Sequence, residues 1–202
     1  MHTRRCSNLT IPNFNAKFIM EYLLKNNIDG SPAVYKTTLR ISEENQKINF
    51  MFAAEHSRFY CPNNHYNGIH SYGDAVEILI GTDPERKVYY EIEVNPDNEI
   101  MLAKMTYLGT DESGSVKLDI SFIDKADCFV SSSAVRTGNG YTVTISIDKS
   151  KLDLSVGDIF FNAYRLETDG GEMEKHLFAL VPTMCGKFHV PEKYVYLKEY
   201  IK

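Results

Sequence analysis

The feature of this sequence that most constrains its fold is a period of two residues, which recurs in short segments along most of the chain. In residues 35–41, Tyr, Thr, Leu and Ile alternate with Lys, Thr and Arg, and residues 48–54 repeat the alternation after a polar turn. Successive side chains of a strand point to opposite faces of a sheet, so this alternation is typical of a half-buried β-strand. The two segments and their turn therefore predict a β-hairpin.

Further segments of this kind follow, and turn residues such as Gly109, Gly114, Gly138-Asn139-Gly140 and Gly170-Gly171 separate them. The expected strands span residues 35–41, 48–54, 76–80, 88–95, 100–107, 116–122, 141–147, 159–166 and 177–181. About nine short strands with turns between them predict an all-β fold, an antiparallel β-sandwich or a barrel, rather than βαβ units. One helix is expected over residues 15–25.

The size of the chain favours a single domain. With 202 residues, of which 43% are apolar, the chain can bury one sizeable core, and it contains no stretch typical of a linker. We therefore expect one β-sandwich domain over residues 1–202, with roughly the first 30 residues peripheral to it. The four cysteines are widely spaced and predict free, mostly buried thiols rather than a disulfide framework.

Charge and hydropathy exclude two classes of partner. The net charge is −5 and there is no basic tract, so neither a nucleic acid nor an anionic membrane surface is an expected partner. The apolar runs at residues 78–80 and 159–161 are far shorter than the ~20 residues that span a bilayer. Residues 6–15 carry Ser, Asn and Pro where a signal peptide would be apolar, so the sequence as it stands indicates a cytoplasmic protein, or an exported one whose signal was removed.

A row of polar side chains is expected on one face of the strands at 76–80 and 88–95. In the second strand Tyr90 and its apolar neighbours form one face, while Glu91, Glu93 and Asn95 lie on the other. Pairing of the two strands would bring Glu77 near these side chains, because same-face neighbours on adjacent strands lie roughly 5 Å apart. Carboxylates so close repel each other, so an Arg or Lys, a bound cation or solvent must balance them; Arg165 is the favoured candidate.

Such a face has the chemistry of a sugar-binding surface. Carboxylate, carboxamide and guanidinium groups are forked and can hydrogen-bond two neighbouring hydroxyls of a sugar at once. Aromatic rings stack on the C–H face of the sugar, and Tyr66, Tyr72 and Tyr164 are available for this. The alternative reading is structural: alternating Glu and Asn on a strand also form an ordinary solvated sheet face.

Four motifs in this order resemble carbohydrate-binding module family 9 and its DOMON-like relatives. The first two, residues 74–80 and 89–96, match a hairpin with the patterns D-x-V-E-x-F-I and Y-x-x-F-E-x-N-P. Residues 162–166 resemble the N-x-x-R-[IL] strand of the family, and residues 188–194 resemble its closing motif F-H-x-P-x-x-[FY]. The resemblance covers about residues 35–196, although this chain has no Trp and lacks the Gly that usually follows the closing motif.

The resemblance implies a jelly-roll-like sandwich that binds a mono- or oligosaccharide without transforming it, often as an accessory to a glycan-degrading enzyme. Tyrosines would replace the tryptophans that clamp the sugar in well-studied members. The implied ligand-binding residues are Glu77, Glu93, Asn95, Asn162, Arg165, Tyr72 and Tyr164. Glu93 occupies a position where those members present a cation.

Two metal sites are alternatives. Cys61, His65, His70 and His56 are of the types that bind zinc, although their spacing matches no familiar zinc finger. The other is a calcium site formed by Asp74, Asp83 or neighbouring carbonyls, because hard oxygen ligands are abundant there and related sandwiches often carry structural calcium.

Two further functions compete with sugar binding. Glu77, Glu91 and Glu93 could serve a glycoside hydrolase, whose paired carboxylates lie about 5 Å or about 6.5–9.5 Å apart, but the sequence implies no cleft. DOMON relatives also include haem carriers with Met and His ligands, for which Met101, Met105 and His176 are available. We expect a binding protein and not an enzyme.

Overall fold

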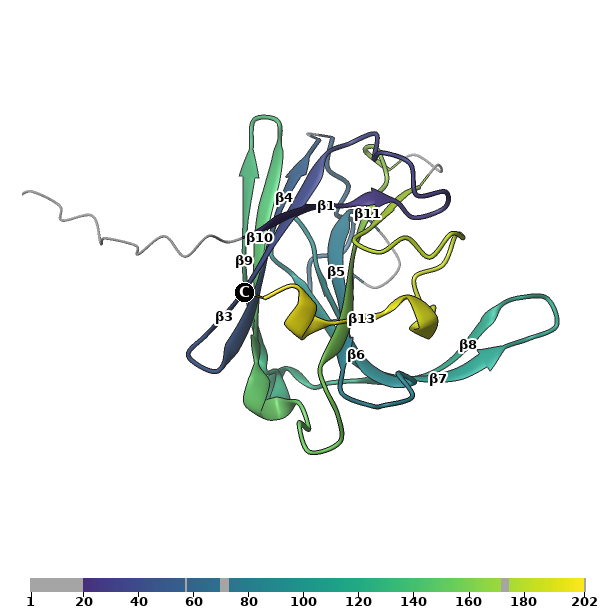
Figure 1. Cartoon of the computed structure of the whole chain (residues 1–202). Helices are drawn as coiled ribbons and strands as arrows, with labels where there is room; N and C mark the ends of the chain where they lie inside the picture. The colour runs from purple at the N-terminus through teal and green to yellow at the C-terminus, as the bar shows by residue number, and fades with distance from the viewer. Residues whose placement is uncertain (1–19, 57, 70–72, 172–174, 202) are drawn as a thin grey trace, which may run out of the picture.

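The computed structural model describes residues 20–56, 58–69, 73–171 and 175–201. Its elements are strands joined by short 3₁₀ turns (Figure 1). The strands are β1 (Glu21–Leu23), β2 (Lys25–Asn26), β3 (Thr37–Glu44), β4 (Lys47–Glu55), β5 (Ala75–Gly81), β6 (Val88–Val94), β7 (Ile100–Thr110), β8 (Val116–Phe122), β9 (Val130–Thr137), β10 (Gly140–Asp148), β11 (Phe160–Glu167), β12 (His176–Ala179) and β13 (Val195–Tyr196). The 3₁₀ turns are η1 (Lys125–Asp127), η2 (Lys149–Lys151), η3 (Pro191–Lys193) and η4 (Leu197–Glu199).

Two antiparallel sheets pack face to face. The five-stranded sheet has the order β1-β3-β4-β10-β9, and the eight-stranded sheet has the order β2-β12-β11-β5-β6-β7-β8, with β13 paired to the other end of β11. The expectation of an all-β antiparallel sandwich is therefore confirmed. Figure 1 shows the two sheets as separate layers, with the β7–β8 hairpin extending beyond the body of the sandwich.

The main core lies between the sheets and follows from the two-residue period. Leu39, Phe50 and Phe52 point inward from the five-stranded sheet, and Ile78 and Ile92 meet them from the eight-stranded sheet. All five are at most 1% exposed. Burial of apolar area at this interface, worth about 25 cal/mol per Å², is the main force that holds the layers together.

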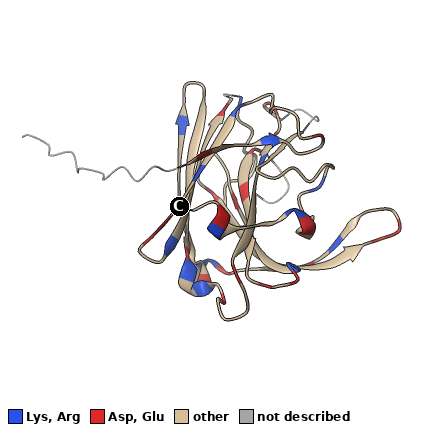
Figure 2. Cartoon of the chain, in the orientation of Figure 1, with Lys and Arg blue, Asp and Glu red and all other residues tan. Residues whose placement is uncertain are grey.

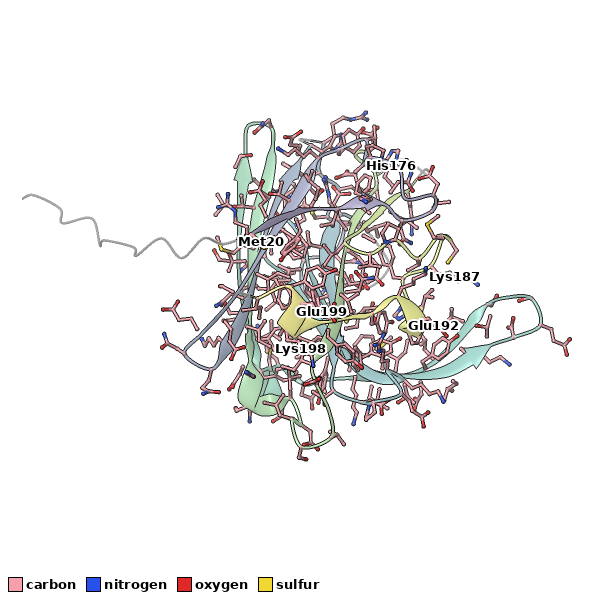
Figure 3. All side chains as sticks on the ribbon, viewed as in Figure 1. Met20, His176, Lys187, Glu192, Lys198 and Glu199 are labelled. Atoms are coloured by element: carbon pink, nitrogen blue, oxygen red, sulfur yellow. The ribbon has the colours of Figure 1, made fainter. Side chains whose placement is uncertain are left out.

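The eight-stranded sheet has a second apolar cluster on its outer face, the face that points away from the five-stranded sheet. Leu79, Tyr89, Met105 and Phe160 belong to this cluster. Residues 186–196, here called the C-terminal segment, cover it with Tyr194 and other aromatic side chains. In Figure 1 this segment, in yellow, lies beside β11 and β5 on that face, and Lys187 and Glu192, labelled on it in Figure 3, are exposed. The middle of the sheet, at β11, β5 and β6, is therefore buried on both faces, whereas β8 at its edge is largely exposed.

Two expectations about the chain path are wrong. The helix expected over residues 15–25 is replaced, from Glu21 on, by the short strands β1 and β2, and residues 15–19 lie outside the described part. β1 pairs with β3 in the register Glu21↔Arg40, so pairing to a sheet edge overrides the short helical pattern. The sequence also concealed β9, because this strand lies at a sheet edge and its Ser-rich residues are mostly exposed.

The cysteines agree only in part with the expectation of free, mostly buried thiols. Cys61, Cys128 and Cys185 are free thiols, half-buried rather than buried, and Cys6 lies outside the described residues. In the ribbon of Figure 2, Lys and Arg lie scattered over several strands and turns, with Asp and Glu between them. Across the described part of the chain, no helix is both long enough and apolar enough to cross a membrane.

Candidate functional site

Three carboxylates meet on the outer face of the eight-stranded sheet. In the register of β5 and β6, Glu77 lies directly opposite Glu93, and Leu79 lies opposite Glu91. Each carboxylate offers one oxygen, and these three oxygens all lie within 4.8 Å of one another. The expectation that strand pairing brings Glu77 to Glu91 and Glu93 is therefore confirmed. We call Glu77, Glu91 and Glu93 the acidic cluster.

The acidic cluster is buried, and burial changes its titration. The exposed fractions of Glu77, Glu91 and Glu93 are 7%, 2% and 6%. Burial is the main cause that raises the pKa of Glu77 well above its ordinary value, and the charges of the other two carboxylates add to this. The pKa of Glu91 is also raised, first by burial and then by the charge and the hydrogen bond of Glu93. The cluster therefore resists holding three negative charges by itself.

A histidine and two tyrosines lie against the acidic cluster. Nδ1 of His189 is 2.9 Å from the hydroxyl of Tyr89, and its Nε2 is 3.8 Å from Oε2 of Glu91. The Tyr194 ring packs edge-on against Tyr89, with ring centroids 5.3 Å apart. Burial is the main cause that raises the pKa of Tyr194, and the charges of Tyr164, Tyr89 and Glu77 add to this shift. His189 and Tyr194 come from the C-terminal segment, so this segment closes over the acids.

Three oxygen atoms at this place lack partners. Among the described residues, Oε1 of Glu77, Oε2 of Glu91 and the hydroxyl of Tyr194 are buried and make no hydrogen bond of ordinary geometry. A buried acceptor or donor without a partner costs about 1–3 kcal/mol. Such atoms in a native protein call for an explanation, and a missing ligand or ion is one.

Asn95 lies next to the acidic cluster in sequence, but its side chain holds a turn. Its Oδ1 accepts hydrogen bonds from the backbone N–H groups of Asp97 (3.0 Å) and Glu99 (2.9 Å), and its Nδ2 donates to the carbonyl of Asn63 at 3.4 Å. The side chain is 1% exposed. These bonds close the connection between β6 and β7 and leave little of Asn95 for a ligand.

Asn162 and Tyr164 share the outer face with Glu77, yet both are already engaged. The Asn162 amide donates to the Tyr164 hydroxyl (2.8 Å) and the Val181 carbonyl (2.9 Å), while its Oδ1 accepts from the Val181 N–H (3.1 Å). The Tyr164 ring stacks on Phe188, with centroids 4.3 Å apart, and its hydroxyl donates to the Phe188 carbonyl. A sugar could stack on Tyr164 only if Phe188 moved away.

Arg165 points to the other face of the sheet. It pairs in register with Val76, a residue of the inter-sheet core, whereas Tyr164 pairs with Glu77. The guanidinium donates to Thr37 Oγ1 (2.8 Å) and the Glu55 carbonyl (3.0 Å) and forms an ion pair with Glu167. It is 0% exposed. The expectation that Arg165 balances the carboxylates of the acidic cluster is therefore wrong, because successive side chains of a strand alternate between faces.

The other predicted ligands have mixed outcomes. Tyr72 and His70 lie outside the described residues, so stacking on Tyr72 and zinc binding by the Cys61–His65–His70 loop stay predictions. Asp74 is 1% exposed and accepts hydrogen bonds from the Tyr60 N–H (2.8 Å) and from the N–H and hydroxyl of Thr168. These bonds fasten the loop before β5 to the end of β11. Calcium binding by Asp74 stays a prediction that this geometry does not favour.

The residues considered for haem do not converge. Met101 and Met105 belong to the outer-face cluster. His176 stacks on Phe178, a residue of the inter-sheet core, with ring centroids 6.3 Å apart. It lies near the end of the sandwich, as labelled in Figure 3. Met and His on opposite faces of one sheet cannot ligate the same iron.

The chemistry available on the outer face is therefore that of clustered acids under an aromatic cover. It offers hydrogen-bond acceptors to hydroxyl groups, and oxygen ligands to a cation. The sequence predictions contained Glu77 and Glu93 but assigned no ligand role to Glu91, His189 or Tyr194. The position of Glu91 two residues before Glu93 puts both side chains on one face of the strand, and this spacing could have identified Glu91 as a member of the site. His189 and Tyr194 lie in the segment that resembles the closing motif of family 9.

Neither a protein-family model nor a curated protein matches the sequence. Solved structures, however, resemble it in fold. A proposed carbohydrate-binding protein from Bacteroides uniformis has a TM-score of 0.68 and 17% identity, over 87% of this chain and 84% of that one. A family 9 carbohydrate-binding module from Caldicellulosiruptor kristjanssonii in complex with glucose has a TM-score of 0.62 and 11% identity, over 100% of this chain and 91% of that one.

A family 9 module from the same organism in complex with cellotriose has a TM-score of 0.54 and 12% identity, over 81% of this chain and 73% of that one. The resemblance to family 9 inferred from the four motifs is thus confirmed at the level of the fold. At such low identity the likeness concerns the architecture, and the function has to be argued from the residues of this chain.

Proposed function

We propose that this chain is a non-catalytic carbohydrate-binding domain, which holds a sugar or the end of a glycan at the acidic cluster. The observation that carries the proposal is a pair of buried carboxylate oxygens that make no hydrogen bond among the described residues, Oε1 of Glu77 and Oε2 of Glu91, on an otherwise well-bonded polar face. Sugar hydroxyls are donors of the kind that these acceptors lack. The solved structures of this fold that hold glucose and cellotriose support the choice of ligand.

Within this proposal Glu77 and Glu91, together with Glu93, accept hydrogen bonds from sugar hydroxyls, and Tyr72 supplies the stacking surface. Asn95 and Asn162 contribute indirectly, because their hydrogen bonds hold the turn after β6 and the strand β11 beside the acids. Arg165 lies on the inner face and takes no part in binding. A glycan-degrading enzyme would be the natural partner of such a domain.

Isothermal titration with glucose, cellotriose and a panel of other mono- and disaccharides tests the proposal. We expect heat of binding with at least one sugar. Glu77→Gln should weaken that sugar's binding by about 10- to 150-fold, since a hydrogen bond to a charged group is worth about 1.5–3 kcal/mol. Glu85→Gln, a change of an exposed acid that pairs with Lys87, is the matched control and should leave the affinity unchanged.

Three outcomes contradict the proposal. Absence of heat with every sugar at millimolar concentration removes sugar binding, and equal affinity of the wild type and Glu77→Gln removes the acidic cluster as the site. Release of reducing sugar from an oligosaccharide over hours, lost in Glu91→Gln, would show a hydrolase instead.

A further inference from the structure

The acidic cluster has a property that sugar binding alone does not account for. Three carboxylates converge so closely that one oxygen of each lies within 4.8 Å of the other two. Carboxylate oxygens gathered around one point surround a volume suited to a single ion. Two ligands of one Ca²⁺ can lie up to about 5 Å apart, because each oxygen is about 2.3–2.6 Å from the ion. The spacing fits that geometry.

Independent features of the surroundings point to the same occupant. Oε1 of Glu77 and Oε2 of Glu91 belong to side chains that are more than nine-tenths buried, and neither atom makes a hydrogen bond among the described residues. The hydroxyl of Tyr194, from the C-terminal segment, is also buried without a hydrogen bond of ordinary geometry, and its ring packs edge-on against Tyr89. His189, from the same segment, is oriented through Nδ1 by the Tyr89 hydroxyl, while its Nε2 lies 3.8 Å from Oε2 of Glu91. A side chain positioned by a hydrogen bond behind it is typical of the surroundings of a bound metal.

We propose that Glu77, Glu91 and Glu93 form a binding site for a divalent cation of the oxygen-preferring class, Ca²⁺ or Mn²⁺, closed by Tyr194 and His189. The three carboxylates supply the ligands, and the ion supplies the positive charge that Arg165 does not bring to this face. Ligands come from β5 and β6, and the cover comes from the C-terminal segment, so the ion would fasten that segment to the sheet. Zn²⁺ fits less well, because it prefers Cys and His in a tetrahedral arrangement.

The cation site goes beyond sugar binding and is tested without any sugar. The protein is dialysed against EDTA and then against chelator-free buffer, and CaCl₂ or MnCl₂ is titrated into it calorimetrically. We expect one ion per chain, and a thermal midpoint that rises with ion concentration because the ion binds only the folded chain. Electron paramagnetic resonance of Mn²⁺ should show loss of the free-ion signal at the same stoichiometry.

Isosteric variants locate the site. Glu77→Gln and Glu91→Gln should each weaken the binding of Ca²⁺ or Mn²⁺ by at least about tenfold, and Tyr89→Phe, which releases His189, should weaken it less. Glu85→Gln, on an exposed turn, is again the control and should bind as the wild type does. Glu77→Gln and Glu91→Gln each remove a carboxylate from the buried acidic cluster, so both variants are expected to fold. Urea unfolding in the absence of the ion checks that they do.

No heat and no change in thermal midpoint up to about 1 mM of either ion would overturn the proposal, as would equal binding by the wild type and both amide variants. The sugar titration, repeated in EDTA and in CaCl₂, separates the two proposals. Sugar binding in EDTA with no ion binding leaves the sugar proposal standing alone, and ion binding without any sugar response leaves the cation site standing alone.

Discussion

His56 joins the two sheets of the sandwich through Glu167: its Nδ1 lies 3.1 Å from Glu167 Oε1, at the end of β11. Its Nε2 is 3.1 Å from Asp169 Oδ1, so the imidazole bridges two acids. The side chain is only 10% exposed, and the residue follows β4 of the opposite sheet. The backbone of His56 has φ = 142°, a region that favours glycine, so the contact is made at a strained position.

Substitution of His56 separates the contact from the strain. His56→Ala loses the bridge and keeps the unfavourable backbone, and we expect it to lower the free energy of unfolding by about 1–3 kcal/mol. His56→Gly loses the same bridge but relieves the backbone, so it should be more stable than the Ala variant by about 1 kcal/mol. Urea unfolding of both variants measures this. If the Ala variant is as stable as the Gly variant, the backbone at residue 56 is not strained.

The ion pair of Arg165 and Glu167 makes a second prediction. Both side chains are 0% exposed, so Arg165→Met leaves a buried carboxylate without its main partner and should cost about 3–5 kcal/mol. Arg165→Met combined with Glu167→Leu removes both charges and should recover much of that loss. Because Arg165 lies on the inner face, the double variant should keep the wild-type affinity for sugar and for Ca²⁺. If the double variant unfolds at the same urea concentration as the wild type but binds sugar or Ca²⁺ more weakly, Arg165 acts on the acidic cluster and its assignment to the inner face is wrong.

Two glycines in the β9–β10 hairpin give a matched pair. A Cβ at Gly140 would lie 2.0 Å from the carbonyl oxygen of Ala54 on the neighbouring strand β4, whereas a Cβ at Gly138 would meet nothing within 4 Å. Gly140→Ala must therefore push two paired strands apart, and we expect a loss of at least about 2 kcal/mol in the free energy of unfolding. Gly138→Ala should change it by less than about 0.5 kcal/mol. Thermal and urea unfolding of the two variants should differ clearly; similar values would mean that β10 can shift at this point without cost.

The two-residue period was sufficient to predict the sandwich and the acidic cluster. Glu77, Glu91 and Glu93 were expected on one surface because strand phase and hairpin pairing are local properties that the sequence encodes. The same rule, applied to residues 162–165, would have shown that Asn162 and Arg165 cannot share a face, since an odd separation in a strand reverses the side. Residues 162–166 resemble the family motif as a whole, but Asn162 and Arg165 within it lie on opposite faces of β11.

Other features depend on contacts that a single sequence does not reveal. The exposed, Ser-rich β9 is a strand because β10 pairs with it along its length, and its own pattern is too polar to indicate this. The engagement of Asn95 in a turn, and the stacking of Tyr164 on Phe188, depend on where distant segments pack. The C-terminal segment covers the outer face for the same reason, so burial of the acids could not be predicted from residues 74–96.

The pH dependence of stability is expected to reveal the state of Glu91. Burial, followed by the charge and hydrogen bond of Glu93, raises the pKa of Glu91 in the folded chain. A raised pKa means that folding favours the protonated acid. The stabilisation is therefore complete below the unfolded pKa of about 4.3 and is lost progressively as the pH rises toward the folded pKa. The groups that face Glu91 are Glu77, Glu93, His189 and Tyr89.

Glu91→Gln, studied in EDTA, removes this penalty. The free energy of unfolding of the variant should exceed that of the wild type at pH 7–8, by about 1.4 kcal/mol for each unit of the raised pKa, and the two should converge near pH 4. Urea unfolding between pH 4 and 8 measures the difference, with the exposed Glu85→Gln as control. Saturating Ca²⁺ should reverse the order at pH 7, because the wild type then gains the binding free energy of the ion and the variant gains less. A Glu91→Gln variant that is less stable than the wild type at pH 8 in EDTA would contradict this prediction. It would show that other groups of the protein already stabilise the negative charge of Glu91.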